Sequence, residues 1–232
     1  MDAVRDGLAE LRGEDARHLA RVLRAEPGQR YEISDNRSAW LAEIAEARGD
    51  RVVFRVLEPL AVAAPPVDIT LCAALIKFDR FEWTIEKATE LGVARIVPVE
   101  TARCEKGLFE ASRKRAARWE RIVRESSQQS RRARMPEIAA ALRFDECLAL
   151  QAGLRYFLEE EAAPPLLRLL PAERAVSARV ALLVGPEGGW TGVERHQAAA
   201  AGWQPASLSP QVLRAETAAA AALAVLVNAW MT

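Results

Sequence analysis

Apolar and polar residues follow two different patterns before and after residue 67. Before it, they alternate along three short stretches that the turn sequences DNRS and ARGDR separate. Alternation with a period of two, interrupted by hairpin turns, is typical of strands in a small sheet or barrel. A short helix is predicted over residues 15–24, and strands are predicted over residues 30–34, 39–46 and 52–57. Residues 1–66 are therefore predicted to form a small β domain.

The chain after residue 67 alternates between apolar strand-like runs and amphipathic helices. Strands are predicted over residues 69–76, 93–99, 155–158 and 179–184. Helices are predicted over residues 81–91, 111–131, 192–201 and 213–230. Strands that alternate with helices form a parallel sheet with helices on both faces. The sequence therefore predicts an α/β domain over residues 67–232, and the stretch AVAAPPV at 61–67 is the best candidate for the linker.

A glycine-rich loop follows the last predicted strand. The segment ALLVGPEGGW, residues 181–190, begins with an apolar run that suits a strand buried on both faces, and Gly185 ends that run. Gly188 and Gly189 permit a positive φ and a close approach by a ligand. Thr191 and Glu194 have the spacing of a helix capping box. Because ligands of open α/β sheets bind at the carboxyl ends of strands, the segment is either a binding loop or an ordinary strand–turn–helix junction.

A second loop of this kind lies close to the C-terminus. In LSPQVLRAETAAAAAL, residues 208–223, a turn at Ser209 precedes a helix that is almost wholly apolar except for Arg214 and Glu216 at its start. These two charges are either a capping pair, with Glu216 on the helix dipole and Arg214 bound to it, or members of a site. Two such loops close together predict a pocket built from backbone amides.

The two loops resemble the C-terminal motifs of the SPOUT methyltransferases, the trefoil-knotted class that binds S-adenosylmethionine. They are most similar to the RsmE-type family, whose pattern runs GPEGG and then LGxRILRxETA. Three further stretches are similar to the same family and follow in the right order: HLARVLR at 18–24, RFEWTIEKATELGVARIVPV at 80–99 and RWERIVRESSQQSRRARMP at 118–136. The resemblance implies a SPOUT-type parallel sheet with a C-terminal trefoil knot and a PUA-like RNA-binding barrel. It also implies a homodimer that methylates N3 of a uridine in 16S ribosomal RNA of the small subunit.

The resemblance further implies which residues form the site. An arginine near the uracil carbonyls would stabilise the developing negative charge, and the candidates are Arg214 and Arg132. A carboxylate would accept the N3 proton, and the candidates are Glu216 and Glu187. The residues expected around S-adenosylmethionine are Leu183, Gly185, Glu187, Gly188, Leu208, Ser209, Leu213 and Thr217. The residues expected to contact RNA are Arg21, Arg24, Lys77, Arg80, Arg131 and Arg134.

Some positions depart from the family pattern. Ser209 stands where glycine is usual, Gln211 where a basic residue is common, and Phe78 where glycine usually follows Lys77. Gln128 and Arg131 likewise replace a usual glutamate and glycine. A serine at position 209 can still offer its backbone amide to a ligand if its φ stays negative.

Charge is unevenly distributed along the chain. The net charge is zero, yet residues 103–134 hold 11 Lys and Arg against 4 Asp and Glu, a local balance of +7. Such a stretch is either a solvated basic helix or the footprint of a phosphate-rich partner. Together with the resemblance, it favours RNA.

Several classes of protein lack support in the sequence. No P-loop, no GxGxxG after a first strand and no GxSxG elbow is present. Three widely spaced cysteines and two histidines offer no zinc-binding spacing, so no metal is expected, and a reducing cytoplasm fits. The N-terminus lacks an apolar signal region, and the alanine-rich stretch 215–230 is more typical of a buried or dimer helix than of a membrane span.

Two rival functions stay open. One is a non-catalytic RNA-binding relative without a cofactor, which only Ser209 and Gln211 favour. The other is a SPOUT methyltransferase that acts on tRNA or on a different rRNA position, because such an enzyme would carry the same loops.

Overall fold

The computed structural model describes residues 4–176 and 178–231, and the chain divides into two compact units. The first unit comprises the described residues up to Ala64 together with Arg131–Arg134. The second comprises Pro65–Ser130 and the described residues from Met135 onward. The chain passes between the units inside the predicted linker, whereas the return of Arg131–Arg134 to the first unit was not predicted.

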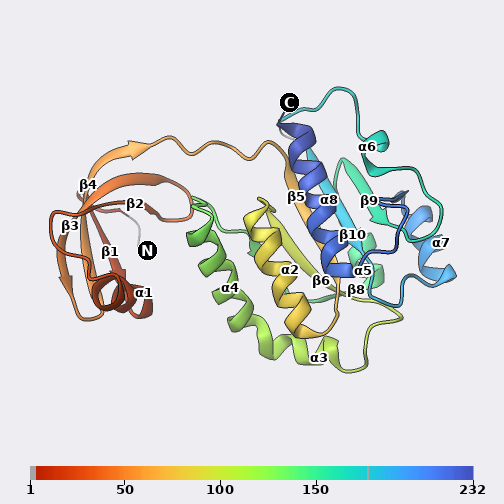
Figure 1. Cartoon of the computed structure of the whole chain (residues 1–232), viewed down its shortest axis with the longest axis horizontal. Coiled ribbons are helices and arrows are strands. Elements are labelled where there is room, and N and C mark those ends of the chain that lie inside the picture. The colour runs from red at the N-terminus through yellow and green to blue at the C-terminus, as the bar shows by residue number, and fades with distance from the viewer. Residues whose placement is uncertain (1–3, 177, 232) are drawn as a thin grey trace. The chain divides into compact units, whose positions relative to one another are not determined.

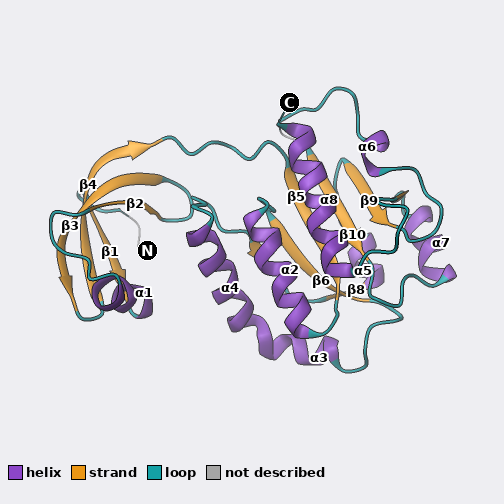
Figure 2. Cartoon of the chain, viewed as in Figure 1, coloured by secondary structure: helices purple, strands orange, loops and turns teal. Residues whose placement is uncertain are grey.

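The first unit is a four-stranded antiparallel sheet with one helical segment (Figures 1 and 2). Its strand order is β1-β4-β3-β2, and the pairing of β3 with β4 contains two register shifts, which bend a sheet. Its core includes Ile33, Ile44 and Phe54. Its elements are β1 Leu8–Arg12, α1 Glu14–Arg17, a π-helical turn His18–Val22, β2 Arg30–Ser34, β3 Ala39–Arg48 and β4 Arg51–Leu60.

The second unit is a parallel sheet with helices on both faces, which confirms the predicted α/β class. The strand order is β11-β9-β10-β5-β6-β7, and β8 also pairs with β6. Its strands are β5 Asp68–Ala74, β6 Arg95–Glu100, β7 Glu137–Ile138, β8 Leu142–Arg143, β9 Leu154–Leu158, β10 Arg179–Val184 and β11 Gln204–Ala206. Its helices are α2 Phe78–Glu90, α3 Leu108–Ser112, α4 Ala116–Gln129, α5 Phe144–Leu148, α6 Leu166–Leu169, α7 Gly192–Ala200 and α8 Ala215–Trp230.

Strand β10 lies at the centre of the sheet and contributes to a core on each face. Val180, Leu182 and Val184 belong to one core cluster, together with side chains of α2, α4 and α8. Ala181 and Leu183 belong to the other cluster, together with side chains of α5 and α7. Burial on both faces explains why this strand is a continuous apolar run in the sequence.

Several predicted elements differ from the structure at their ends. The expected helix over 111–131 is α3, a 3₁₀ turn at Arg113–Arg115 and then α4. Helix α2 begins at Phe78, three residues earlier than predicted, and α8 begins at Ala215, two residues later. The sequence analysis missed β1, β7, β8, β11, α5 and α6, because segments of two to five residues are too short to display a period. The trefoil knot stays a prediction.

Candidate functional site

A cleft opens at the carboxyl edge of the parallel sheet, where the chain leaves three neighbouring strands. Strands β11, β9 and β10 lie side by side and run in the same direction, so the loops that follow them meet at one edge. The cleft is lined by Leu158, Glu159, Glu160, Val184, Gly185, Pro186, Glu187, Gly189, Trp190, Leu208, Ser209, Gln211, Val212, Leu213, Ala215 and Ala218. The two predicted loops therefore do form a common pocket, and a third loop, after β9, completes it.

The loop after β10 is shaped around the indole ring of Trp190. This ring is buried, and its Nε1 donates a hydrogen bond of 2.7 Å to the Leu158 carbonyl at the end of β9. A Cβ at Gly185 would lie 2.9 Å from Cε2 of the ring, so no other residue fits at 185 without a shift. The glycine at 185 thus permits the Trp190 ring to pack across the end of β10 and to form a hydrogen bond to the end of β9.

Gly189 has the positive φ that the sequence predicted for this loop. Its φ is +66°, whereas Gly185 and Gly188 are not among the described glycines with positive φ. A Cβ at Gly189 would lie 2.7 Å from Cδ of Glu160, because that carboxyl group rests directly over the glycine. The backbone at Gly189 therefore favours glycine, and any Cβ there would displace the Glu160 carboxylate.

Thr191 and Glu194 form the predicted capping box at the start of α7. Glu194 N–H donates to Thr191 Oγ1 at 3.2 Å, and Thr191 N–H donates to Glu194 Oε2 at 2.9 Å. The other carboxylate oxygen of Glu194 accepts a hydrogen bond of 2.8 Å from the amide of Ala102, in the loop after β6. Glu194 is buried, so one carboxylate fixes both the end of the glycine loop and a loop distant in sequence.

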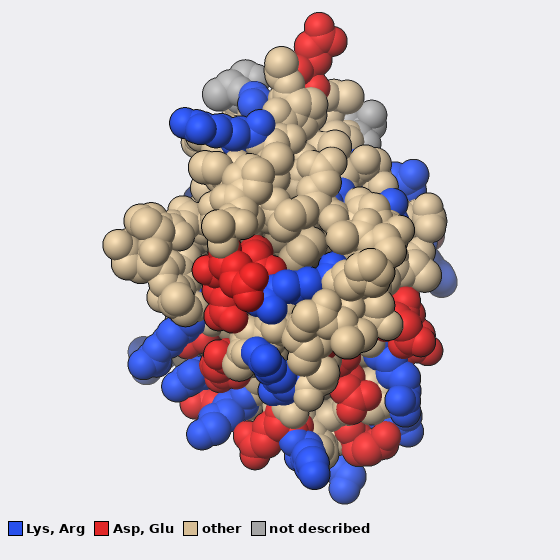
Figure 3. All heavy atoms as spheres, turned by 90° about the vertical axis from the view of Figure 1, so that its right-hand side faces the viewer, with Lys and Arg blue, Asp and Glu red and all other residues tan. Residues whose placement is uncertain are grey.

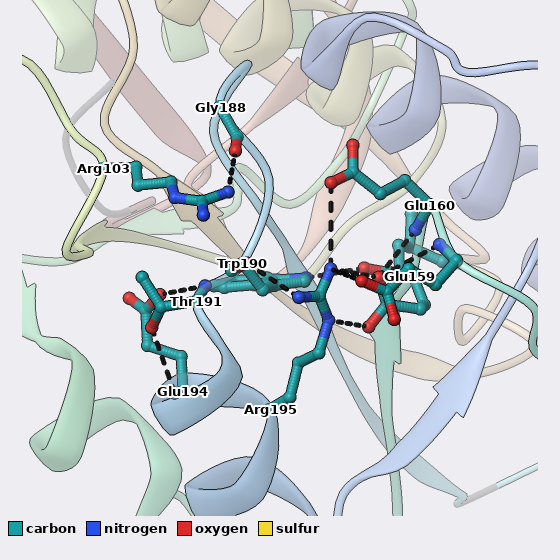
Figure 4. A network of polar contacts seen from close by, with 10 residues as sticks. Arg103, Glu159, Glu160, Gly188, Trp190, Thr191, Glu194 and Arg195 are labelled. Carbon is teal, nitrogen blue, oxygen red and sulfur yellow. Dashed lines mark hydrogen bonds and ion pairs between the residues drawn. The ribbon is translucent and has the colours of Figure 1, made fainter.

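Arg195 ties the glycine loop to the acidic run that follows β9 (Figure 4). Its Nε and Nη2 bind the two oxygens of Glu159 at 2.7 and 3.0 Å, and its Nη1 donates to the Trp190 carbonyl at 2.9 Å. Nη2 also lies 3.1 Å from Glu161 and 3.7 Å from Glu160. Burial raises the pKa of Glu159, but the bonds from Arg195 and from the amides of Glu160 and Glu161 together outweigh that effect and hold the pKa below its ordinary value.

Arg80 bridges the two loops at the rim of the cleft. It extends from α2, and its Nη1 donates to Glu187 at 3.1 Å while its Nε lies 3.9 Å from Glu216. Of the two alternatives for Arg214 and Glu216, the capping pair is wrong, because no ion pair between them is present in the described part of the chain. Residues two apart on a helix point in different directions, so Glu216 faces α2 while Arg214 is the exposed N-cap residue of α8.

The expected cofactor residues divide into two groups. Gly185, Glu187, Leu208, Ser209 and Leu213 line the cleft. Leu183 is buried in the core, Thr217 is exposed on α8, and Gly188 accepts a hydrogen bond from Arg103, so these three do not line it. Ser209 is not among the described residues with positive φ, and its Oγ accepts a hydrogen bond from Gln211 N–H at 3.1 Å. The serine is therefore accommodated without backbone strain.

The expected RNA-contacting and catalytic arginines lie on both units. Arg21 and Arg24 are exposed on the first unit, as are Arg131 and Arg134, while Lys77 is the exposed N-cap residue of α2. Arg132 belongs with the first unit and is half-buried, and burial lowers the pKa of its guanidinium.

The basic stretch 103–134 is partly neutralised by one acid of α2, Glu82. Arg118 of α4 binds Glu82 through two hydrogen bonds of 2.6 and 2.7 Å, and Arg115 lies 3.5 Å from the same carboxylate. The positive charge available to a partner in this stretch is therefore smaller than the sequence count suggests.

The sequence analysis missed the residues that complete the cleft after β9. Glu159 and Glu160 follow directly after a predicted strand, and that position was a signal for a site at the sheet's carboxyl edge. Among the described residues, no group of three or more His, Cys, Asp or Glu is placed to hold a metal ion. None of the helices in the described ranges is both long and apolar enough to cross a membrane.

Comparisons with known proteins agree on the class of this chain. A family model for an RNA methyltransferase domain matches residues 63–227, and one for an RNA methyltransferase PUA domain matches residues 11–57. The ribosomal RNA small subunit methyltransferase E of Synechocystis sp. is 35% identical over 213 residues, which cover 89% of this chain and 68% of that protein. The protein of the same name from Mycobacterium bovis is 34% identical over 238 residues, which cover 96% and 88%. The solved structure of the Neisseria gonorrhoeae enzyme of that name, bound to S-adenosyl methionine, matches with a TM-score of 0.88 at 31% identity and covers 99% of this chain and 95% of that one.

Proposed function

The chain belongs to the RNA methyltransferase family whose domain spans residues 63–227, and from that premise we propose that it methylates N3 of a uridine in 16S ribosomal RNA with S-adenosylmethionine as the methyl donor. The observation that carries the proposal is the cleft, in which the loops after β10 and β11 meet at the carboxyl edge of the sheet. The relatives named as small subunit methyltransferases, over most of this chain, support the ribosomal substrate.

The residues of the cleft fit an adenosyl group. Leu158, Val184, Leu208, Leu213 and Ala218 supply apolar contact for a base, while the glycine-rich backbone supplies hydrogen-bonding groups. When bound, S-adenosylmethionine supplies a methyl group already activated by its sulfonium. The chain then has to orient that group toward the uracil and assist the loss of the N3 proton.

Four polar residues are the candidates for these two tasks. Arg214 ends the loop that lines the cleft, and we assign it to the negative charge that develops on the uracil carbonyls; Arg132 is the second candidate for this role. Glu216 and Glu187 are the candidate proton acceptors. Glu216 Oε2 is buried without a hydrogen bond to any described residue, which leaves it able to accept one.

The proposal includes a homodimer that acts on the small subunit in the cytoplasm. Trp83 of α2 is 41% exposed, and Thr217, Ala224 and Asn228 of α8 are also exposed. An exposed large aromatic side chain suits burial against a second copy. Light scattering coupled to gel filtration tests this part, and a monomer at micromolar concentration would contradict it.

RNA binding is proposed to follow the basic residues of both units. On the face of the molecule shown in Figure 3, positive and negative side chains alternate over the lower half, while the upper half is largely uncharged. A surface of mixed sign attracts phosphates weakly. We therefore assign RNA contacts to the exposed basic residues of each unit: Arg21, Arg24, Arg131 and Arg134 in the first, and Lys77 and the exposed arginines of α4 in the second.

Calorimetry and nucleoside analysis test the catalytic proposal together. The protein is expected to bind S-adenosylmethionine and to transfer tritium from its methyl group to small subunits from a strain that lacks the gene. Mass spectrometry of the digested RNA should then show 3-methyluridine. Leu213→Arg, which puts a charge into the apolar wall, is expected to abolish binding, while Val193→Ala, at an exposed position of α7 outside the cleft, is not.

Each alternative predicts a different result in the same assays. A cofactor-free RNA-binding relative would bind RNA with a strong salt dependence and bind no S-adenosylmethionine. A SPOUT enzyme for another position would bind the cofactor but leave 16S ribosomal RNA unmodified and methylate tRNA or another rRNA. Failure of the unaltered protein to bind the cofactor would end the catalytic proposal.

A further inference from the structure

A carboxylate stands beside the glycine loop at the edge of the sheet. Strands β9 and β10 are adjacent and parallel, so the acidic run after β9 and the glycine-rich loop after β10 emerge at the same edge. In dinucleotide-binding α/β proteins, a glycine loop on one strand and an acid at the end of another strand together hold a nucleoside, and the acid binds the ribose hydroxyls. The present sheet is of a different kind, but the ribose hydroxyls of any bound nucleoside likewise need hydrogen-bond acceptors.

Of the three acids that line the described part of the cleft, Glu160 is the one whose carboxylate accepts no hydrogen bond from an arginine. Glu159 is bound through both oxygens by Arg195, and its side chain is 5% exposed. Glu187 accepts a hydrogen bond of 3.1 Å from Arg80. The side chain of Glu160 is 38% exposed, and its distance of 3.7 Å from Arg195 is too long for a hydrogen bond.

The position of Glu160 is defined by its neighbours. Its carboxyl group rests over Gly189, where any side chain would overlap it. Arg195 Nη2 lies 3.7 Å away and attracts the carboxylate without a hydrogen bond to it (Figure 4). The glycine at 189 thus leaves space for the Glu160 carboxylate in the wall of the cleft.

We propose that Glu160 binds the ribose hydroxyls of the adenosine nucleoside in this cleft, an inference that rests on the proposed function. A carboxylate can accept hydrogen bonds from two neighbouring hydroxyls at once, and it cannot donate to them. Hydrogen bonds to an ionised group are stronger than neutral ones. Glu160 therefore makes the site select a ribonucleoside over its deoxy analogue.

The test uses two ligands that differ in the amino-acid part. S-adenosylhomocysteine carries both the ribose and an ammonium group, whereas 5′-methylthioadenosine carries the ribose and no charge. Calorimetry should show that Glu160→Gln weakens the binding of both by a similar factor, about tenfold or more, as expected for loss of a charge-assisted hydrogen bond. The matched control is Glu161→Gln, at the next carboxylate, which binds Arg195 but does not line the cleft. It should change neither affinity by more than about twofold.

A third ligand isolates the hydroxyls. The 2′,3′-dideoxy form of methylthioadenosine should bind the unaltered protein more weakly than methylthioadenosine does, and this difference should shrink in Glu160→Gln. Thermal unfolding of both variants should match the unaltered protein, which shows that the fold is retained.

Three results overturn parts of the argument and can be told apart. If Glu160→Gln weakens only the binding of S-adenosylhomocysteine, the carboxylate meets the ammonium group and the ribose contact is wrong. If it changes neither ligand, Glu160 has no part in binding. If the unaltered protein binds no nucleoside, the proposed function fails first, and the ribose contact fails with it.

Discussion

Replacing Gly189 by alanine should damage the cleft more than the fold. The φ of this residue is +66°, and a residue with a Cβ pays roughly 1–2 kcal/mol in that region of the backbone. For a chain of this size, such a loss lowers the melting temperature by about 2–8 °C. The new Cβ would also lie 2.7 Å from Cδ of Glu160, the far end of a half-exposed side chain that can turn away at little cost. Turning away removes the carboxylate from the wall of the cleft.

The assay therefore combines thermal unfolding with calorimetry of methylthioadenosine binding. Gly189→Ala should lose about tenfold in affinity, as Glu160→Gln does, and the double variant should lose no more than either alone. Gly188→Ala is the control, because Gly188 has no positive φ and its Cβ would meet Arg103 at 3.3 Å, a contact that a small shift relieves. Equal damage from Gly188→Ala, or additive losses in the double variant, would refute the reasoning.

Three further predictions concern polar contacts around the cleft. Arg195→Met leaves Glu159 buried without its cation and should cost about 3 kcal/mol at pH 7 by urea unfolding. The pKa of Glu159 is lowered in the fold from its ordinary value of 4.5, so the pair stabilises above that pH, and the loss in the variant should shrink as pH falls below it. Glu194→Gln weakens three hydrogen bonds, one from the loop after β6 and two from Thr191 at the start of α7, and should cost about 1–3 kcal/mol in the same assay. Arg80→Met removes the bridge between Glu187 and Glu216, and calorimetry should show S-adenosylmethionine binding weakened by roughly threefold.

The parallel sheet could be predicted because its central strands are unusual in sequence. Strands β5, β6 and β10 are buried on both faces, so each is a run of apolar residues that no surface element would carry. Edge strand β11 spans only three residues and has no such pattern. Strand β1 was missed for a related reason, since charged residues interrupt its five positions.

The long basic helix shows a limit of periodicity. Trp119 and Val123 of α4 are buried and predicted a helix correctly, but the 3₁₀ turn at Arg113–Arg115 contains no apolar residue. A change in helical geometry over three charged residues leaves the hydrophobic pattern unaltered. The break before α4 was therefore not visible in the sequence.

The candidate site was predictable as two loops but not as a set of contacts. The glycines indicated where the backbone turns, yet the reason for each glycine is a residue elsewhere: the Trp190 ring for Gly185 and the Glu160 carboxylate for Gly189. The second of these contacts depends on β9 lying next to β10, an order that no spacing along the chain reveals. Once the strand order is known, few residues are candidates for contact with the glycine loop, because the residues that face it come directly after the strands on either side of it. On one side of β10 that position holds Glu159 and Glu160, and on the other side, after β5, the chain leads through Lys77 to Arg80. The loop is thus approached by carboxylates from one neighbour and by a cation from the other.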